Sequence, residues 1–334
     1  MRTFLFLFFS VQAMNLYDVS REIKSVLKED KRDVDSFGIK NNKLALVLID
    51  GLGWNISKDI KTSINPRQID SIFPSITVTV FATLLTAKKP GEHGILGWRI
   101  INKENGTIEN LMEKLKKENI EVDTYFQNTN SLFIMPEVAT KSLMGKLKVI
   151  PYFTYWDGLY KFRTALDRSD NDFVFFYIPY VDAASHLYGP NHEVTLNTAK
   201  EVVQKIDCIS SYFKEKYSIL VTADHGHTEI TRTIDLKKDK EFMTEMDFPP
   251  YGDHRSLMFK GKLPKSLLKY GINVIEGEKV EEILGGNKNK PDYVLIPKDD
   301  NIIIYWEDDR KHEFKGSHGG LTEDEMKIPL YLYQ

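Results

Sequence analysis

LALVLIDG, at residues 44–51, is the stretch that decides the fold. Its six apolar residues do not alternate with polar ones, which is typical of a strand buried on both faces of a parallel sheet. Two later apolar runs repeat the design: Phe173–Ile178 leads to Asp182, and Ser218–Thr222 leads to Asp224. Because ligands bind beyond the carboxyl ends of parallel strands, we predict that the aspartates of all three segments border one crevice.

Helical patterns fill the sequence between these strands. Residues 194–217 contain no proline or glycine, and Val202, Val203, Ile206 and Ile209 recur on one face at helical spacing. Two shorter helices are predicted at residues 108–118 and 160–167. Strands that alternate with helices indicate an α/β protein, and we predict a three-layer α/β/α fold with a mostly parallel central sheet.

Residues 231–311 have a different pattern. Strands are predicted at 256–260 and 272–275, helices at 264–269 and 279–284, and a hairpin over 293–306. We interpret this region as a small inserted α+β lobe, because residues 316–333 return to a turn and a last apolar strand. The core domain is therefore expected to comprise residues 14–230 and 312–334.

The composition indicates a globular protein without a nucleic-acid footprint. The 334 residues include 45 Lys and Arg against 48 Asp and Glu, so the formal net charge is -3 and no strongly basic block occurs. Cys208 is the only cysteine, which excludes an intrachain disulfide and a thiolate-rich zinc site. Any metal ion must therefore be held by Asp, Glu and His.

The first thirteen residues contain a short apolar run after Arg2. The run is too short to span a bilayer, and no transmembrane segment is predicted. It is either a secretory signal or a stretch upstream of a start at Met14, and we leave both interpretations open. The lack of disulfide-forming cysteines favours a cytoplasmic location, with export as the alternative.

Candidate metal ligands gather in short motifs. Asp182 and His186 are four residues apart, so a helix places both on one face. DHGH at residues 224–227 offers one carboxylate and two imidazoles directly after a strand. His318 lies among glycines, which let the backbone approach a ligand closely. Each motif alone has an ordinary explanation, such as a helix cap or a buried hydrogen-bonded histidine, but together they indicate a metal site.

The ligand types indicate phosphoryl transfer. Oxygen and nitrogen ligands without thiolate suit Zn²⁺ or Mn²⁺, and two such ions can clamp the attacking and leaving oxygens of an in-line displacement. Ser75, Thr77 and Thr79 precede an apolar helical run and are candidate nucleophiles. A helix N-terminus favours anions, although hydroxyls at this place are also ordinary N-caps.

Six segments occur in an order that is similar to one family. They are LIDG (48–51), FPSIT (73–77), PGEHGI (90–95), DAASH with its following GP (182–190), DHG (224–226) and HGG (318–320). Together they resemble the type I phosphodiesterase and nucleotide pyrophosphatase branch of the alkaline phosphatase superfamily, which implies an alkaline-phosphatase-like fold. The resemblance assigns two ligand sets, one for each ion: Asp182, His186 and His318, and Asp50, Thr77, Asp224 and His225. It also implies that Thr77 attacks phosphorus and forms a phospho-threonine, which water hydrolyses.

One position departs from this family. The nucleotide pyrophosphatases commonly have an asparagine after the His-Gly-Ile stretch that hydrogen-bonds a phosphoryl oxygen, and this sequence has Trp98 there. The oxyanion then needs another donor, so we predict Trp98, Arg99 and Arg255 as substrate contacts. His93 is expected to be a structural residue of its turn and not a ligand. The other histidines are expected to surround the site or to lie at the surface, with His227 foremost among them to touch the site: His192, His227 and His254.

We therefore predict a two-metal hydrolase of phosphodiester or nucleotide pyrophosphate bonds, with Zn²⁺ preferred over Mn²⁺ and a small phosphate ester or nucleotide as substrate. A phosphomonoesterase and a phosphonate hydrolase are the alternatives within the superfamily. A sulfatase would need a Cys or Ser in a Cys/Ser-x-Pro-x-Arg context, which the sequence around Thr77 lacks. An inactive metal-stabilised binding protein is disfavoured because the ligand set is complete. The sequence does not determine the oligomeric state.

Overall fold

The structure is a computed structural model that describes residues 14–28, 37–102, 105–117, 120, 122–140, 143, 145, 147–298, 300–311 and 313–334. The apolar run at residues 1–13 lies outside this range, and so does the choice between a signal segment and an upstream start. Among the described residues, no helix has the length and apolar character needed to cross a membrane.

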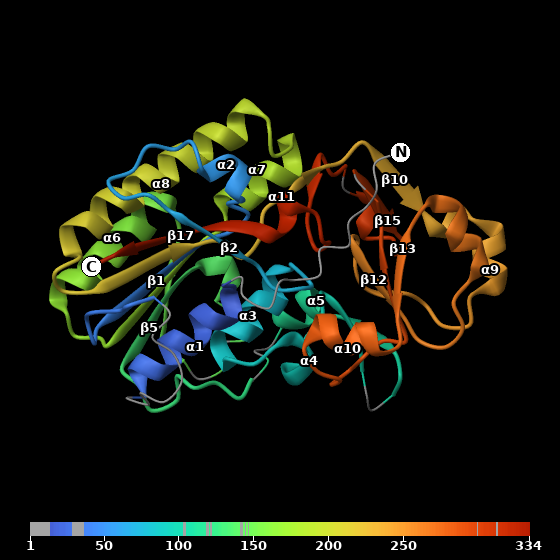
Figure 1. Ribbon diagram of the computed structural model, residues 1–334, viewed down its shortest axis with the longest axis horizontal. Helices are drawn as coiled ribbons and strands as arrows, with labels where there is room; N and C mark the ends of the chain where they lie inside the picture. Colours follow the sequence, from blue (N-terminus) through green and yellow to red (C-terminus); the bar gives the residue numbers. More distant parts are fainter. Residues whose placement is uncertain are drawn as a thin grey trace.

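The larger lobe is built on a seven-stranded sheet (Figure 1) with the order β2-β17-β8-β1-β7-β5-β6. The three predicted strands are present and buried along their whole length: β1 (Leu44–Ile49), β7 (Phe173–Ile178) and β8 (Ser218–Thr222). β1 pairs in parallel with both β7 and β8. The other strands are β2 (Arg67–Asp70), β5 (Ser131–Pro136), β6 (Val149–Tyr152) and β17 (Lys327–Tyr333), of which β17 is antiparallel to β2 and β8. The prediction of a mostly parallel central sheet is confirmed.

Helices cover both faces of this sheet (Figure 1), which confirms the three-layer α/β/α architecture. One face carries α6 (Tyr155–Arg168) and α8 (Glu193–Phe213), and the other carries α1 (Leu16–Leu27) and α3 (Thr77–Thr86). The apolar stripe of α8 is buried as predicted, because burial of such a stripe is what stabilises a surface helix. The shorter helices of this lobe are α2 (Trp54–Ser57), α4 (Pro90–His93), α5 (Leu111–Leu115), α7 (Tyr180–Tyr188), α11 (Glu323–Met326) and the 3-10 turn η1 (Glu137–Ala139).

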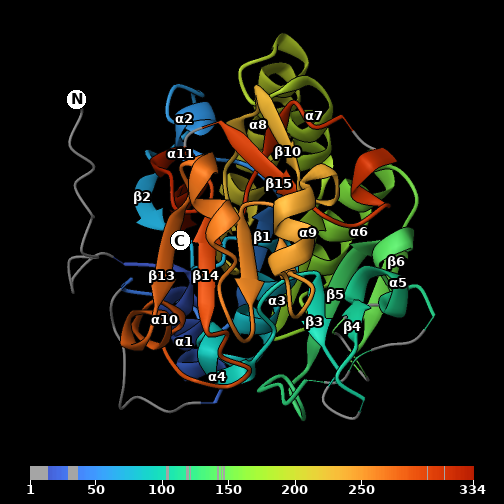
Figure 2. The same ribbon diagram turned by 90° about the vertical axis from the view of Figure 1, so that its right-hand side faces the viewer.

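The smaller lobe contains a six-stranded antiparallel sheet (Figure 2) with the order β13-β14-β12-β11-β3-β4. Four of its strands come from the predicted insert: β11 (Tyr251–Asp253), β12 (Ser256–Phe259), β13 (Asn273–Glu276) and β14 (Tyr293–Ile296). The other two, β3 (Arg99–Ile101) and β4 (Ile108–Asn110), come from much earlier in the chain. Two separate segments therefore complete this sheet.

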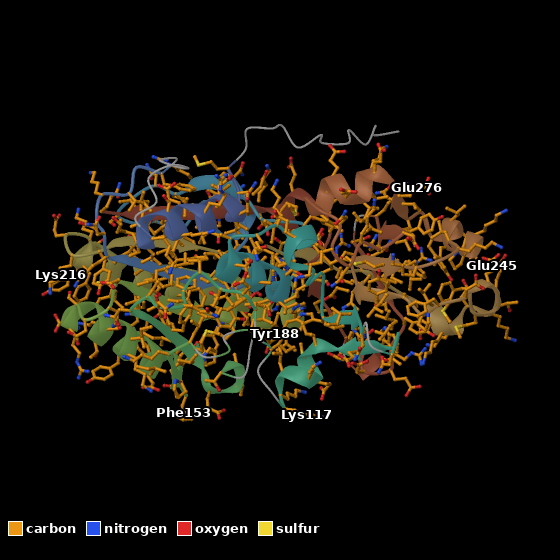
Figure 3. All side chains as sticks on the ribbon, turned by 90° about the horizontal axis from the view of Figure 1, so that it is seen from below. Lys117, Phe153, Tyr188, Lys216, Glu245 and Glu276 are labelled. Atoms are coloured by element: carbon orange, nitrogen blue, oxygen red, sulfur yellow. The ribbon has the colours of Figure 1, made fainter. Side chains whose placement is uncertain are left out.

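Helices and short strands complete the smaller lobe. They are α9 (Lys240–Glu245), α10 (Glu278–Leu284), the 3-10 helices η2 (Leu236–Lys238), η3 (Lys265–Tyr270) and η4 (Asp309–Lys311), and strands β10 (Arg232–Asp235) and β15 (Asn301–Ile304). Strands β9 (Thr228–Glu229) and β16 (Gly316–Ser317) pair with each other, and β16 contacts α7 of the larger lobe. Lys216 of the larger lobe and Glu245 of α9 lie near opposite ends of the molecule (Figure 3).

Two local predictions were wrong. Residues 293–306 do not form a hairpin, because β14 pairs with β12 and β13 whereas β15 pairs in parallel with β10. Residues 108–110 are strand β4 rather than the start of a helix, because they pair with β3. The helix predicted at 264–269 is present as the 3-10 helix η3 (Lys265–Tyr270).

His93 is the last residue of the short helix α4 and has structural contacts, as expected of a residue that is not a ligand. The Ile95 N–H donates to His93 Nδ1 at 3.1 Å, so the ring proton is on Nε2, which lies 3.0 Å from Thr83 Oγ1. Burial, with help from Lys288 and Lys88, lowers the pKa of His93 to about 3. The neutral ring therefore belongs to the folded state.

We expect His93 to make folding sensitive to acid. A histidine whose pKa is lower in the folded than in the unfolded chain stabilises fully above the unfolded pKa of about 6.5, and this contribution is lost as the pH falls towards 3. His93→Gln keeps a donor for Thr83 but cannot be protonated. Urea unfolding at pH 7.5 and 4.5 should show a smaller loss of stability for the variant than for the wild type, and equal losses would contradict the role.

Candidate metal centre

The predicted ligands gather at the carboxyl edge of the central sheet. Asp50 directly follows β1 and Asp224 follows β8 after one residue, while Asp182 lies in the first turn of α7, which follows β7. These three strands are neighbours in the order β8-β1-β7, so their carboxyl ends meet. The structure brings all seven predicted ligands together at this edge: Asp50, Thr77, Asp182, His186, Asp224, His225 and His318.

One group of ligand atoms surrounds His225 Nε2. This nitrogen lies 3.4 Å from Asp50 Oδ1, 3.3 Å from Asp224 Oδ2 and 3.2 Å from Thr77 Oγ1. Both carboxylate oxygens are buried and have no hydrogen-bond partner. Buried charged oxygens are normally paired or bound to a metal ion, so these atoms have the character of ligands.

The other oxygen of each carboxylate, Asp50 Oδ2 and Asp224 Oδ1, accepts hydrogen bonds from the protein. Tyr177 donates its hydroxyl proton to Asp50 Oδ2, and the N–H groups of Gly51 and His225 donate to Asp224 Oδ1 at 3.1 and 3.0 Å. Burial raises the pKa of Asp50, and the neighbouring Asp224 raises it further. A bound cation would offset this repulsion and keep both carboxylates ionised.

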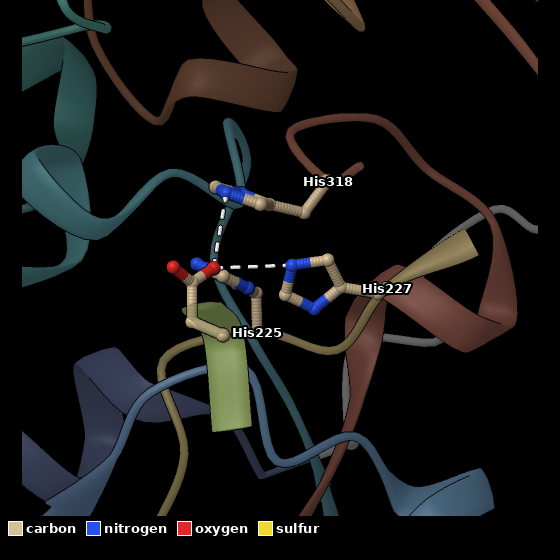
Figure 4. A group of neighbouring side chains, drawn as sticks. His225, His227 and His318 are labelled. Atoms are coloured by element: carbon tan, nitrogen blue, oxygen red, sulfur yellow. Dashed lines mark ion pairs between the residues drawn. The ribbon is translucent and has the colours of Figure 1, made fainter. Parts of the chain in front are cut away.

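A second group surrounds Asp182 Oδ1, which is also buried without a hydrogen-bond partner. The nearest nitrogens are Nε2 of His227 at 3.1 Å, of His186 at 3.2 Å and of His318 at 3.7 Å. Figure 4 shows the rings of His225, His227 and His318 converging on one place. Because helix α7 carries both Asp182 and His186, the predicted spacing of four residues does place them on one face.

Backbone carbonyls orient the imidazole rings. His186 Nδ1 lies 2.8 Å from the Gly316 carbonyl oxygen, and His318 Nδ1 lies 2.8 Å from that of Ser75. Such contacts fix the proton on Nδ1 and leave Nε2 free to bind a metal ion. Burial and the adjacent histidines hold the pKa of His318 well below its ordinary value, so its ring is neutral, as a ligand must be. The donor set fits divalent metal ions.

The three candidate hydroxyls differ in their surroundings. Thr77 is half-buried at the first position of α3, and its Oγ1 contacts His225. Ser75 is fully buried, where its hydroxyl donates to the Gly320 carbonyl and accepts from the Gly319 N–H. Thr79 is fully buried, and its hydroxyl has no partner. None of them caps α3, because the N-cap residue is Ile76. Of the three, the geometry favours Thr77.

The two arginines expected to contact substrate have other partners. Arg255 is fully buried, and its guanidinium donates to both carboxylate oxygens of Glu325 and to the Asn301 carbonyl. Arg99 donates to Asp308 at 2.8 Å and to Asp309 at 2.7 Å. The geometry does not support phosphoryl contacts for either arginine, since their charges are already engaged. Trp98 is half-buried against the core, and its substrate contact stays a prediction.

Residues 44–316 match the family model described as type I phosphodiesterase / nucleotide pyrophosphatase. The chain belongs to this family. Among curated proteins it is similar to ectonucleotide pyrophosphatase/phosphodiesterase family member 7 of Rattus norvegicus, with 23% identity over 271 residues that cover 70% of this chain and 58% of the relative. The human protein of the same name is also 23% identical, over 67% of this chain and 58% of its own. This family member thus spans little more than half the length of those relatives.

Solved structures share the fold of this family member. Murine ectonucleotide pyrophosphatase/phosphodiesterase 5 superposes with a TM-score of 0.63 at 17% identity, covering 86% of this chain and 87% of that one. Phosphonoacetate hydrolase from Sinorhizobium meliloti 1021, in complex with phosphonoformate, gives a TM-score of 0.61 at 15% identity, with coverage of 87% and 90%. The alkaline-phosphatase-like fold is confirmed by these likenesses.

Proposed function

We propose that the chain hydrolyses phosphodiester or nucleotide pyrophosphate bonds with two divalent cations and with Thr77 as the nucleophile. One observation carries the proposal: two groups of ligand atoms, whose Asp50, Asp182 and Asp224 oxygens are buried without a hydrogen-bond partner, lie side by side at the carboxyl edge of the sheet, and the Thr77 hydroxyl contacts one group. Family membership supports the same chemistry, because the family is named for these two reactions.

The ligands divide into two sets in this proposal. Asp182, His186 and His318 hold one cation, and Asp50, Thr77, Asp224 and His225 hold the other. Zn²⁺ is preferred and Mn²⁺ is the alternative, because the donors are carboxylate, hydroxyl and imidazole without thiolate. When bound, the two cations neutralise charge on the phosphoryl oxygens and polarise the phosphorus centre for attack.

The chain itself supplies the nucleophile and its orientation. Thr77 Oγ1 attacks phosphorus, the bond to the leaving-group oxygen breaks, and a phospho-threonine remains. Water then attacks the same phosphorus and regenerates the Thr77 hydroxyl. Because Thr77 opens helix α3, the N–H groups of the first turn favour the anionic phosphoryl group during both steps.

Two similar proteins help to define the substrate class. An inactive variant of murine ectonucleotide pyrophosphatase/phosphodiesterase 5 has been solved in complex with AMP, which favours a nucleotide substrate here. The phosphonoacetate hydrolase and the presence of Trp98 at the family asparagine position keep a phosphonate or monoester substrate as the second candidate. A small phosphate ester is common to both candidates.

A substrate panel tests the proposal. The full chain, loaded with Zn²⁺ or Mn²⁺, should hydrolyse bis-p-nitrophenyl phosphate and dinucleotide pyrophosphates faster than p-nitrophenyl phosphate or phosphonoacetate, and a chelator should abolish turnover. Asp50→Asn should lose metal and activity together, because a ligand carboxylate is removed. Asp59→Asn, a matched change at an exposed carboxylate outside both groups, should retain both.

Each contrary result has a distinct meaning. Preference for the monoester or the phosphonate would move the chain to the second candidate. Full metal loading without turnover of any substrate would identify a metal-stabilised binding protein. Unchanged metal content in Asp50→Asn would remove Asp50 from the ligand set.

A further inference from the structure

His227 differs from the other histidines of the metal centre in its hydrogen bonding. It is fully buried, yet neither ring nitrogen has a hydrogen-bond partner. The other three imidazoles of the site differ in this respect, because His186, His225 and His318 each place Nδ1 against a backbone carbonyl. Burying an imidazole without hydrogen bonds lowers the stability of the fold, unless a bound ligand or ion satisfies its nitrogens.

The position of the His227 ring beside Asp182 indicates that a metal ion satisfies it. His227 Nε2 lies 3.1 Å from Asp182 Oδ1, nearer than the corresponding nitrogens of His186 and His318. The contact lacks hydrogen-bond geometry, since both atoms are without a partner. One ligand atom each from Asp182, His225, His227 and His318 lies within 4.8 Å of all the others. His227 Nε2 and Asp182 Oδ1 are thus placed to bind one metal ion together.

The backbone is shaped to accept this ring. A β-carbon on Gly51 would lie 2.7 Å from His227 Cε1 and 2.7 Å from the Asp182 Cα, so only glycine fits between β1 and α7 at this point. Gly51 also has φ +74°, which favours glycine. Gly51 therefore packs against the His227 ring and fixes the orientation of that ring.

We propose that His227 Nε2 is a fourth protein ligand of the cation held by Asp182, His186 and His318. The inference rests on the proposed two-cation site and adds a third histidine to one half of it. The four ligands would make that site richer in nitrogen than its neighbour, which holds two carboxylates, one hydroxyl and one imidazole. The two ions should therefore differ in affinity and in absorption spectrum.

Cobalt substitution tests this ligand without relying on activity. The full chain is freed of metal and titrated with CoCl₂, and the visible absorption of wild type, His227→Gln and His254→Gln is recorded at each equivalent. His254 is the matched control because its Nε2 faces Asp309 at 3.1 Å, outside both groups of ligand atoms. Loss of a ligand changes the number of donors around Co²⁺, and with it the intensity and position of the visible bands.

We expect wild type and His254→Gln to bind two equivalents with the same spectrum. His227→Gln should change the bands of one equivalent only and weaken its binding by about 100-fold or more, beyond the 10–100-fold typical of residues that merely orient a ligand. Weaker binding with unchanged bands would make His227 a positioning residue of Asp182 and overturn the inference. Unchanged binding and bands would overturn it as well.

Two further results keep the inference separate from the proposed function. A wild type that binds fewer than two equivalents would refute the two-cation function itself, whatever the variant does. If His227→Gln does not fold, ¹⁵N-histidine NMR of the wild type during Zn²⁺ titration replaces it. The His227 Nε2 resonance should then move with the ring nitrogens of His186 and His318, and a stationary resonance would overturn the inference.

Discussion

Thr77→Ala is expected to lower kcat on the best diester roughly 10³-fold or more, because loss of a nucleophile removes the covalent path outright. The fold and most of the metal affinity should remain, since six other predicted ligands stay in place. Thr77→Ser keeps a hydroxyl at the same position and should retain far more activity. Steady-state kinetics and metal analysis of the wild type, Thr77→Ala and Thr77→Ser measure the changes in kcat and in metal content.

Thr79→Ala is the matched control for the nucleophile. The Thr79 hydroxyl is buried without a partner and does not cap α3, so its loss should change turnover little. Near-normal turnover in Thr77→Ala together with collapse in Thr79→Ala would transfer the role to Thr79. Two successive displacements should also leave phosphorus with net retention of configuration, and inversion would remove the role from both threonines.

Breaking the Arg255–Glu325 pair is expected to give the largest loss of stability. Both side chains are fully buried, with Arg255 Nε 2.5 Å from Glu325 Oε1 and Nη2 3.0 Å from Oε2. Glu325→Gln leaves the guanidinium buried without its counter-charge, which costs about 3–5 kcal/mol of unfolding free energy. Adding Arg255→Met should recover part of this loss, because no unpaired charge then remains. Urea unfolding measures all three proteins.

The same pair supports the metal centre. Glu325 accepts the Gly320 N–H at 2.9 Å, and Gly320 lies two residues after His318. Glu325→Gln should therefore also weaken metal binding through a loosened loop. Glu113→Gln, which breaks the exposed pair with Lys116, should leave stability and metal binding nearly unchanged. A Glu325→Gln protein that unfolds at the wild-type urea concentration would contradict the structural role.

The core sheet and the gathering of the predicted ligands at its edge were predictable because their signals are local. β1 and β7 are uninterrupted runs of apolar and aromatic residues, and β8 has an apolar centre. Each leads to an aspartate, and the carboxyl edge of neighbouring parallel strands brings such residues together. Asp182 and His186 are four residues apart, so a helical segment alone is enough to place them on one face. These features depend on a few adjacent residues and not on the rest of the chain.

The features that were missed depend on distant partners. β15 pairs with β10, about seventy residues earlier, whereas the apolar run and turn before it resemble a hairpin with β14. β5 and β6 were not predicted, although β5 is buried along its whole length between β7 and β6. Arg255 was expected to contact substrate, but nothing local indicates that Glu325 faces it. Pairing over long separations is set by packing, which a local pattern does not contain.

The shared sheet of the smaller lobe limits how this part of the molecule can be exchanged between relatives. A chimaera that transplants residues 231–311 alone would set β11 against the recipient's own counterpart of β3, where Gly252 pairs with Arg99 in this chain, and a poor match there would leave strand edges bare. Bare edges recruit strands from other chains and promote aggregation. The donor would have to contribute β3 and β4 in the same step, so recombination at a single pair of breakpoints cannot replace the lobe. Divergence within it must proceed by substitutions that both segments tolerate together.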